Sequence, residues 1–333
     1  MDTAERSLLT VKDLVQEFVV NMPGQGKRRI QAVSGVSFEI YRGETLALVG
    51  ESGCGKSSLA RAVLQLPRPL SGQVLFRGKD LASESGKELR RDINGMQVVF
   101  QDPYDSLDPR WHVDQLVAEP LEINGVGSPQ ERANRVSELL EAVGLDSRIH
   151  GRRRPRELSG GQCQRVAIAR ALALNPMLMV CDEPVSSLDV SVQAQILNLF
   201  EDLRSAFGLA YLFITHDLSV ARRVSDRIAV MYLGKLVELA SATDIFARTR
   251  HPYSAALLSS IPRSDGQQSS GRIRLTGDLP SAANPPSGCR FRTRCPFVQP
   301  ICVNAEPPLT EISPSHWVAC HFPLSGSVPM TSS

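Results

Sequence analysis

The 333-residue sequence predicts an α/β fold in which buried parallel strands carry functional loops at their carboxyl ends. Two observations predict it. The apolar run Leu46–Val49 is followed by a glycine-rich turn and then by KSSLARAVLQL, whose apolar residues have helical spacing. A second apolar run, from Leu178 to Cys181, ends in the adjacent carboxylates Asp182 and Glu183. Open α/β folds bind their ligands at this carboxyl edge of the sheet.

The overall composition is that of a globular chain. Hydrophobic residues make up 42% of the sequence and charged residues 22%. No run approaches the roughly 18 consecutive apolar residues that cross a bilayer. The start, MDTAERSLLTVKD, lacks the basic and then apolar pattern of a signal peptide. We therefore expect a chain that is kept in the cytosol, where thiols stay reduced.

The distribution of charge and proline separates a body from a tail. Residues 251–333 hold 6 of the 37 basic and 4 of the 35 acidic residues, so the first 250 residues carry 31 of each sign. A nucleic-acid surface normally needs a basic excess, which this body lacks. The tail also holds 12 of the 22 prolines. We therefore expect one domain over residues 1–250 and a second, small one over residues 251–333.

The glycine-rich turn is a complete phosphate-binding loop, G-x4-G-K-S, between a strand and a helix. Gly53 and Gly55 let backbone N–H groups curl around phosphate oxygens, and the helix N-terminus adds partial positive charge. Lys56 is expected to reach the β- and γ-phosphates, and Ser57 to ligate Mg²⁺. Cys54 is interpreted as a small filler rather than a nucleophile. The predicted nucleotide-binding residues of the loop are Gly50, Ser52, Gly53, Cys54, Gly55, Lys56, Ser57 and Ser58.

The carboxylate pair after the second apolar run completes the chemistry that the phosphate loop begins. Adjacent strand residues point to opposite sides, so Asp182 and Glu183 can do different jobs. Asp182 is expected to hold the Mg²⁺ shell, and Glu183 to polarise the attacking water. General-base help of this kind contributes about 10²–10⁴ in rate.

Between these two features lies Leu158-Ser-Gly-Gly-Gln162, which starts the helical run CQRVAIARALAL. A helix N-terminus of this kind is a natural anion seat. The sequence resembles the signature of ATP-binding cassette (ABC) proteins. The resemblance implies that Ser159, Gly160, Gly161 and Gln162 cap the γ-phosphate of ATP bound by a second chain, with two sites in a head-to-tail dimer. It also implies a P-loop NTPase fold, with a RecA-like core, an antiparallel β subdomain and an inserted helical subdomain.

Four further residues fall into register with that family. Gln101 resembles the glutamine that senses Mg²⁺ and the attacking water, and Asp189 the residue that links the two sites of the dimer. His216 resembles the switch histidine at the γ-phosphate. A lone histidine is usually structural, but a position at a strand end after both halves of the site favours function. Phe18 is a candidate to stack on adenine, or equally a core residue of its strand.

A helical lobe is expected at about residues 105–160. Its clearest helix starts at Ser128 with a capping box to Glu131, and its apolar face is expected to run from Ala133 to Val143. In ABC proteins such lobes receive membrane-spanning partners near the glutamine, so residues 101–111 are the candidate docking region. The arginine run at residues 152–156 is interpreted as a solvated face.

The tail carries Cys289, Cys295, Cys302 and Cys320 in the spacing C-x5-C-x6-C-x17-C. Disulfides conflict with the expected reducing compartment, and a proline-rich segment this short has little core for four unrelated buried thiols. A metal site with four cysteine ligands would supply the cross-link that a segment with little core needs. Spacing alone does not choose between zinc and iron–sulfur. The neighbouring Arg290, Arg292 and Arg294 suit the negative charge of four thiolates.

A narrower resemblance covers the tail. GCRFRTRC and HWVAC resemble the C-terminal motif of ATPases of dipeptide and oligopeptide importers, some of which carry a [4Fe–4S] cluster there. VCDEPVSSLDVSVQAQILNL resembles the F-type subunit of a dipeptide permease. The resemblance implies a second, paralogous ATPase chain, two permease subunits and a substrate-binding protein as partners, no nucleic acid, and a peripheral place at the cytoplasmic face of the inner membrane.

Other functions stay open at this point. Importers of nickel or glutathione use similar ATPases. A soluble ABC ATPase acting on ribosomes or DNA is disfavoured, because such proteins commonly carry two cassettes or long coiled-coil insertions. A non-catalytic regulatory subunit is disfavoured by the intact Glu183, His216 and signature. The four-cysteine site could hold Zn²⁺ instead of iron–sulfur.

Overall fold

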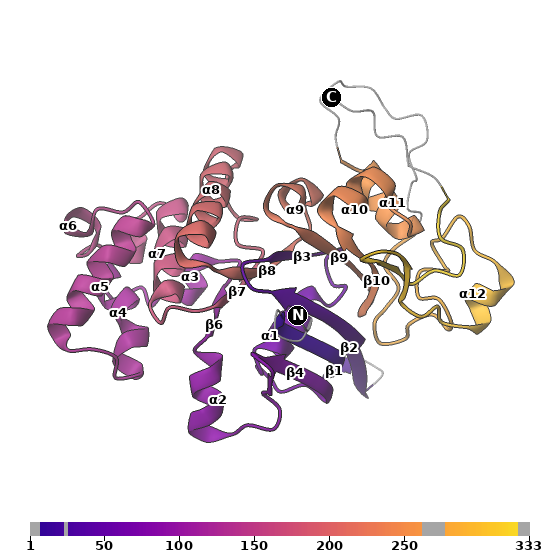
Figure 1. The fold of residues 1–333 in the computed structure, drawn as a ribbon, viewed down its shortest axis with the longest axis horizontal. Helices are drawn as coiled ribbons and strands as arrows, with labels where there is room; N and C mark the ends of the chain where they lie inside the picture. The colour runs from indigo at the N-terminus through magenta and orange to yellow at the C-terminus, as the bar shows by residue number, and fades with distance from the viewer. Residues whose placement is uncertain (1–6, 23–25, 262–276, 326–333) are drawn as a thin grey trace. The chain divides into compact units, whose positions relative to one another are not determined.

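The computed structural model describes residues 7–22, 26–261 and 277–325 (Figure 1). The polar stretch at residues 263–272 lies outside these described residues. The chain divides into two compact units. The first comprises residues 1–8, 40–44 and 83–214, and the second residues 9–39, 45–82 and 215–333.

The first unit contains three parallel strands, β6 (Met96–Val99), β7 (Leu178–Asp182) and β8 (Ala210–Thr215), of which β7 and β8 are buried throughout. β7 lies in the middle, with Leu178 opposite Met96 on one side and Ala210 on the other. All of its residues are buried, which fits a strand covered on both faces. The predicted apolar strand that ends at Asp182 is confirmed.

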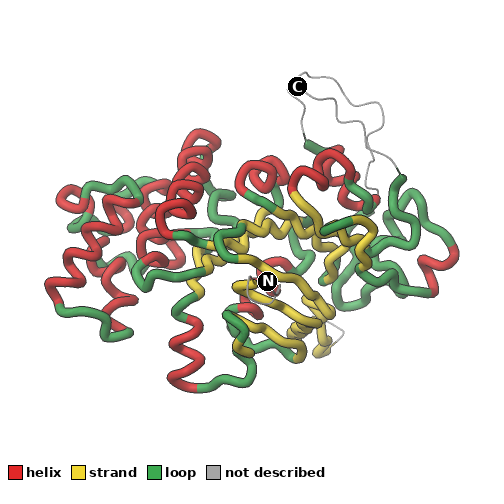
Figure 2. The backbone as a smooth tube through the Cα atoms, viewed as in Figure 1, coloured by secondary structure: helices red, strands yellow, loops and turns green. Residues whose placement is uncertain are grey.

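The rest of the first unit is mainly helical (Figure 2). The helices are α2 (Gly86–Ile93), α3 (Pro103–Ser106), α4 (Val113–Ile123), α5 (Pro129–Ala142), α6 (Ser147–His150), a 3₁₀ turn (Pro155–Glu157), α7 (Gly160–Leu172) and α8 (Val190–Phe207). α5 begins as predicted: the Glu131 carboxylate accepts from the Ser128 N–H at 2.7 Å. Its buried stripe is narrower than predicted, because Ala133 is exposed while Val136, Leu139 and Leu140 are buried.

The second unit holds a mixed set of strands in the order β11-β12-β10-β9-β3. These are β3 (Thr45–Val49), β9 (Arg227–Tyr232), β10 (Lys235–Ser241), β11 (Thr310–Ser313) and β12 (His316–Val318). β3 and β9 are parallel, and the other pairs are antiparallel. β9 and β10 form an antiparallel hairpin, and the tail adds β11 and β12 beside it.

A separate four-stranded sheet, in the order β2-β1-β4-β5, belongs largely to the second unit. It consists of β1 (Ser7–Met22), β2 (Gly26–Tyr41), β4 (Ser71–Phe76) and β5 (Lys79–Asp80). The helices of the unit are α1 (Lys56–Val63), α9 (Leu218–Val224), α10 (Ala242–Arg248), α11 (Pro252–Ser259) and α12 (Pro300–Asn304).

One hydrophobic core joins the body and the tail within the second unit. Ala47 and Val49 of β3 and Tyr232 of β9 share this core with Tyr253 of α11 and with Phe291. Phe291, between the first two tail cysteines, is only 1% exposed. The expectation that the cysteine segment has little core is therefore wrong, because it packs into the core of the strands.

No helix among the described residues is long and apolar enough to span a membrane.

Candidate active site

The phosphate loop connects the end of β3 to the start of α1. Glycine is required at both ends of the loop by close backbone approach. A Cβ at Gly50 would lie 2.2 Å from the Met231 carbonyl oxygen, and one at Gly55 would lie 2.2 Å from that of Ala32. Gly55 also has φ 109, which side chains rarely adopt. The backbones of β9 and β2 thus lie directly against the two ends of the loop.

Lys56, the first residue of α1, directs its ammonium into the loop. Its Nζ donates to the carbonyl oxygens of Gly50 at 2.8 Å and Glu51 at 3.1 Å. The residue is only 5% exposed. The ammonium group therefore lies inside the loop, where the phosphate groups of a nucleotide are expected to bind.

Cys54 has the character of a packing residue. It is buried, and burial raises the pKa of its thiol although the Lys56 charge opposes the shift. A raised pKa disfavours the thiolate that nucleophilic chemistry needs. The structure thus agrees with the interpretation of Cys54 as a filler.

The second unit also contains two candidates outside the phosphate loop, His216 and Phe18. His216 is exposed in the turn after β8, beside Asp217, whose carboxylate caps α9 by accepting from the Ser219 N–H at 2.7 Å. Phe18 is half-buried near the end of β1. Contact of these side chains with γ-phosphate or adenine stays a prediction.

The carboxylate pair follows β7 in the first unit. Asp182 is the last strand residue and is 8% exposed. Glu183 adopts φ 49, an uncommon conformation for a non-glycine residue, and its N–H donates to the Ile214 carbonyl at 3.0 Å. Backbone strain of this kind persists where the surroundings enforce it and is common at functional sites.

The predicted signature opens α7 with a capping box. Ser159 Oγ accepts from the Gln162 N–H at 3.3 Å, and the Gln162 side chain accepts from the Ser159 N–H at 3.0 Å. A Cβ at Gly161 would lie 2.5 Å from the Val192 side chain, so glycine allows α8 to approach closely. Asp189 caps α8 by accepting from the Val192 N–H at 3.0 Å. The structure therefore brings the signature and the Asp189 cap together.

The segment around Gln101 lies against the same region of the first unit. The Gln101 carbonyl accepts from Ser187 Oγ at 3.4 Å, and the Tyr104 hydroxyl donates to the Leu158 carbonyl at 3.3 Å, directly before the signature. Arg170 of α7 donates to the Ser106 carbonyl at 2.6 Å and forms an ion pair of 2.6 Å with Glu119 of α4. These contacts connect the candidate docking region with the signature helix.

Arg170 was not predicted, and Tyr104 was predicted only as part of the docking region 101–111, not as a contact of the signature. Arg170 did carry a signal, because it is the one charged residue in the run VAIARALAL. A charge on an otherwise buried helix face needs partners. Tyr104 carried no such signal, since its partner is more than 50 residues away in the chain.

The predicted site residues divide between the two units. The first unit contains Gln101, Ser159, Gly160, Gly161, Gln162, Asp182, Glu183 and Asp189, and the second contains Phe18, the loop residues 50–58 and His216. The two predicted Mg²⁺ ligands on the phosphate loop and β7, Ser57 and Asp182, belong to different units. Each offers an oxygen ligand of the type that Mg²⁺ prefers.

The four tail cysteines converge on one small cavity, which they line with His251, Phe291 and the aromatic rings of residues 297 and 322. Cys302 is buried and the other three are half-buried. Burial raises the pKa of Cys320 to about 11, and the three other thiols add to the shift. Across the described residues, no group of three or more His, Cys, Asp or Glu side chains is gathered in a way that could hold a metal ion. The metal centre therefore stays a prediction, and the alternative of clustered buried thiols stays open.

The three arginines of the cysteine segment do not act together as the predicted counter-charges. Arg294 forms a two-nitrogen ion pair with Glu51 of the phosphate loop, at 2.6 and 3.0 Å. Arg290 donates to the Leu233 carbonyl, and Arg292 donates to the Ser287 carbonyl at 2.8 Å. Of the three, only Arg292 lines the cysteine cavity. The other two guanidinium groups contact oxygens of the body, at Glu51 and Leu233.

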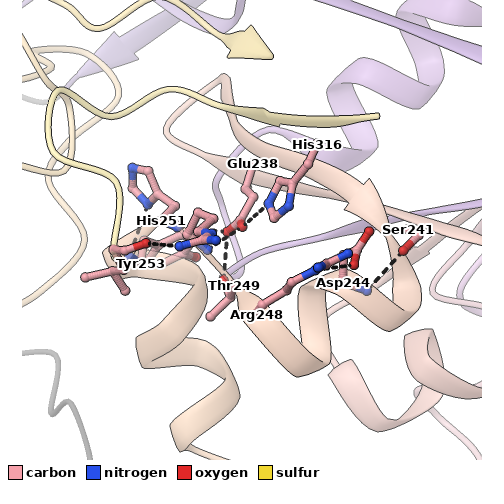
Figure 3. A network of polar contacts seen from close by, with 10 residues as sticks. Glu238, Ser241, Asp244, Arg248, Thr249, His251, Tyr253 and His316 are labelled. Atoms are coloured by element: carbon pink, nitrogen blue, oxygen red, sulfur yellow. Dashed lines mark hydrogen bonds and ion pairs between the residues drawn. The ribbon is translucent and has the colours of Figure 1, made fainter. Parts of the chain in front are cut away.

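A buried carboxylate, Glu238 of β10, anchors the start of α11 and the tail (Figure 3). Its oxygens accept from Thr249 Oγ1 at 2.8 Å, from the N–H groups of Arg250 at 2.6 Å and His251 at 3.1 Å, and from His316 Nε2 at 2.8 Å. Burial acts to raise the pKa of Glu238, but these hydrogen bonds outweigh it and lower the pKa below its ordinary value. The ionised carboxylate thus ties β12 and the residues before α11 to β10.

Comparison with known proteins decides the family. Residues 33–186 match the family described as ABC transporter, and residues 237–302 match the one described as oligopeptide/dipeptide transporter, C-terminal region. The oligopeptide transport ATP-binding protein AppF of Bacillus subtilis (strain 168) is 48% identical over 96% of this chain and 98% of its own length. This chain belongs to the family of oligopeptide transport ATP-binding proteins.

Other relatives of this ABC ATPase agree. The oligopeptide transport ATP-binding protein OppF of Haemophilus influenzae (strain ATCC 51907 / DSM 11121 / KW20 / Rd) is 47% identical over 87% of this chain and 88% of its own length. The ATP-binding cassette MJ0796, solved as a dimer in a post-hydrolysis state with ADP and Pi, covers 70% of this chain and 98% of its own with a TM-score of 0.62 and 30% identity. The predicted ABC-type P-loop fold is confirmed.

Membership of the family establishes the reaction of this ABC ATPase. It binds ATP with Mg²⁺ and hydrolyses it. The phosphate loop, the carboxylate pair and the signature are the parts of the chain with the chemistry for that reaction. The roles assigned to the individual residues stay predictions.

Proposed function

We propose that this ATPase powers the import of dipeptides or oligopeptides through a membrane transporter. The observation that carries the proposal is the 48% identity to a protein named for oligopeptide transport across nearly the whole chain, tail included. The separate match of residues 237–302 to the oligopeptide/dipeptide transporter C-terminal region supports it. A generic ABC match would not distinguish among solutes, whereas the family matched by the tail is described by oligopeptide and dipeptide transport.

The proposed mechanism uses two ATPase chains. The phosphate loop of one chain and the seat Ser159–Gly161 of another clamp ATP, and hydrolysis reopens the pair. In this chain, Lys56 contacts the β- and γ-phosphates and Glu183 polarises the attacking water. Ser57 and Asp182 hold Mg²⁺, which neutralises charge on the phosphates. Gln101 and His216 orient the water and the γ-phosphate, and Asp189 links the two sites.

The proposed partners are those of a peptide importer. They are a second ATPase subunit, which we expect to be a paralogous chain, two permease subunits and a substrate-binding protein. The ATPase would lie at the cytoplasmic face of the inner membrane and contact the permease through residues 101–111. Exposed Tyr104 and Trp111 support this contact, because aromatic side chains are enriched at protein interfaces.

The tail is proposed to hold a [4Fe–4S] cluster. The donor set supports it: four thiols from distant positions line one cavity, and thiolates are the usual ligands of such clusters. A single Zn²⁺ needs four sulfurs at about 2.3 Å from one point. The resemblance of GCRFRTRC and HWVAC to importer ATPases, some of which carry such a cluster, favours it over Zn²⁺.

Iron and acid-labile sulfide analysis of anaerobically purified chain tests the cluster. We expect about four of each per chain, lost in Cys302→Ala but retained in Cys181→Ala, a variant of a buried cysteine on β7. One zinc per chain without sulfide would overturn the cluster.

Reconstitution in proteoliposomes tests the import function. The permease and binding protein that co-purify with the chain are reconstituted with it, and ATP turnover is measured with dipeptides, oligopeptides, Ni²⁺ or glutathione. Peptides are expected to stimulate turnover and to accumulate inside. Stimulation by Ni²⁺ or glutathione alone would assign a related importer. Co-purification with ribosomes or DNA instead of a permease would contradict import.

A further inference from the structure

Glu51, the second residue of the phosphate loop, is held by two residues from beyond position 250. The Arg294 guanidinium donates two hydrogen bonds to its carboxylate, at 2.6 and 3.0 Å. The Tyr253 hydroxyl accepts from the Glu51 N–H at 2.9 Å. All three residues belong to the second unit. The C-terminal region therefore holds both the backbone and the side chain of a loop residue.

Glu51 also contacts loop residues that are expected to face the nucleotide. Its carbonyl oxygen accepts from Lys56 Nζ at 3.1 Å and from the Cys54 N–H at 3.3 Å. A shift of Glu51 would therefore move an acceptor of the ammonium that reaches the phosphates. Arg294 is connected to Lys56 through one residue.

The ion pair lies in a shielded environment. The Arg294 side chain is 7% exposed and that of Glu51 is 28% exposed. Phe291 packs beside it in an aromatic cluster, with ring centroids 5.3 Å from Tyr232 and 5.4 Å from Tyr253. Two parallel N–H···O bonds fix the geometry of such a pair as well as its energy. Loss of one partner from a shielded pair has a larger effect than at the surface, because the other charge is left uncompensated.

The sign of the charge matters at this position. Glu51 lies in the loop that binds the triphosphate, so an unneutralised carboxylate would repel ATP. Within the Debye length of about 10 Å at 0.1 M salt, this repulsion is only partly screened. Arg294 cancels that charge while it fixes the loop.

We propose that Arg294 is a positioning residue for ATP binding, through which the C-terminal region holds the phosphate loop in place. It acts on the nucleotide through Glu51. The inference goes beyond peptide import and requires only ATP binding, so it is tested on the full chain without permease or peptide.

The test is the ATP dissociation constant of full-length variants, measured by titration calorimetry with Mg-ATP. Arg294→Gln is expected to weaken ATP binding about tenfold, equal to about 1.4 kcal/mol. Arg294→Lys should recover part of the loss, because it keeps the charge but not the two-nitrogen geometry. The double variant Glu51→Gln/Arg294→Gln should bind ATP more tightly than Arg294→Gln, because the lone carboxylate is gone.

Arg292→Gln is the matched control. Arg292 lies two residues away in the same segment and bonds Ser287, so its loss should leave the ATP affinity within about twofold of the wild type. Thermal unfolding of each variant separates a folding defect from a binding defect. The proposal is overturned if folded Arg294→Gln binds ATP like the wild type, if Arg292→Gln loses as much, or if the double variant is no better than the single one. Should Arg294→Gln not fold, wild-type affinity in Arg294→Lys overturns it.

Discussion

At Lys56 the ammonium is turned into the phosphate loop, where it donates to two carbonyl oxygens at 2.8 and 3.1 Å. The loop is thus shaped around a cation. Charged hydrogen bonds contribute about 1.5–3 kcal/mol each, so a residue that contacts two phosphates has a dominant effect on affinity.

Lys56→Ala is accordingly expected to weaken ATP binding by about 100-fold or more, because about 3 kcal/mol or more of charged hydrogen bonding is lost. Titration with Mg-ATP measures the loss. Lys87→Ala, which changes an exposed lysine of α2, serves as the control and should bind like the wild type. Unchanged affinity in Lys56→Ala would show that the loop does not bind the phosphates.

Glu183→Gln is expected to hydrolyse ATP about 10²–10⁴ times more slowly, because the amide is no base for the attacking water. ATP binding should persist, since the phosphate loop is intact. Turnover and ATP affinity are measured side by side, with Glu138→Gln on the surface of α5 as a control expected to retain wild-type turnover. Wild-type turnover in Glu183→Gln would refute its assignment as the base.

Single residues were predictable from sequence where their role depends on near neighbours. Lys56 and Glu183 lie in short motifs whose glycine spacing or strand context is local. Tyr253 and Arg294 could not be found in this way, because their partner Glu51 is 202 and 243 residues away. Arg294 was predicted to balance the thiolates, because the cysteines are its neighbours in the sequence.

Among the elements, the start of α11 depends on a buried histidine. His251 Nδ1 accepts from the Tyr253 N–H at 3.1 Å, and Glu238 accepts from the His251 N–H. Burial lowers the pKa of His251 to about 4, against the opposing charge of Glu238. The neutral ring is therefore part of the folded structure.

Stability is expected to fall as pH is lowered from 6.5 to 4, because the unfolded chain binds a proton at residue 251 in this window and the folded chain does not. At 1.36 kcal/mol per pKa unit, this contribution is about 3 kcal/mol. His251→Asn keeps a capping side chain. The free energy of unfolding of this variant should fall by about 3 kcal/mol less than that of the wild type over the same pH range. Urea unfolding at several pH values measures it, with pH 8 as the reference where both residues are neutral. If the free energy of unfolding depended on pH equally in the wild type and in His251→Asn, a neutral buried His251 would be contradicted.

The elements show the same limit of sequence reasoning as the residues. The start of α5 at Ser128 and the strand that ends at Asp182 follow from local capping and hydrophobic patterns, and both were predicted. β12 was not predicted, since three residues become a strand only by pairing with β10, where Glu238 lies opposite Val318. The apolar face of α5 was predicted too wide at Ala133, because periodicity does not show where the packed neighbour ends.

At the scale of the whole molecule, the chain distributes ATP chemistry over two compact units. The second unit combines the phosphate loop with the cysteine-rich region in one hydrophobic core. The proline content and charge balance indicated a boundary near residue 250. They did not indicate that residues 253 and 291 pack into the core beneath the loop. Composition shows where a chain changes character, whereas packing decides what the new segment contacts.

The central claim of the proposed mechanism is that ATP pairs two chains, with the phosphate loop of one and the signature of the other around the nucleotide. The most direct test is sedimentation velocity of full-length Glu183→Gln with saturating Mg-ATP, alone and mixed with the ATPase subunit that co-purifies with it. We predict a two-chain species that requires ATP in at least one of these samples and is lost when Ser159→Arg is added to the chain. An ATP-saturated chain that stays single in both samples would contradict a nucleotide clamped between two subunits.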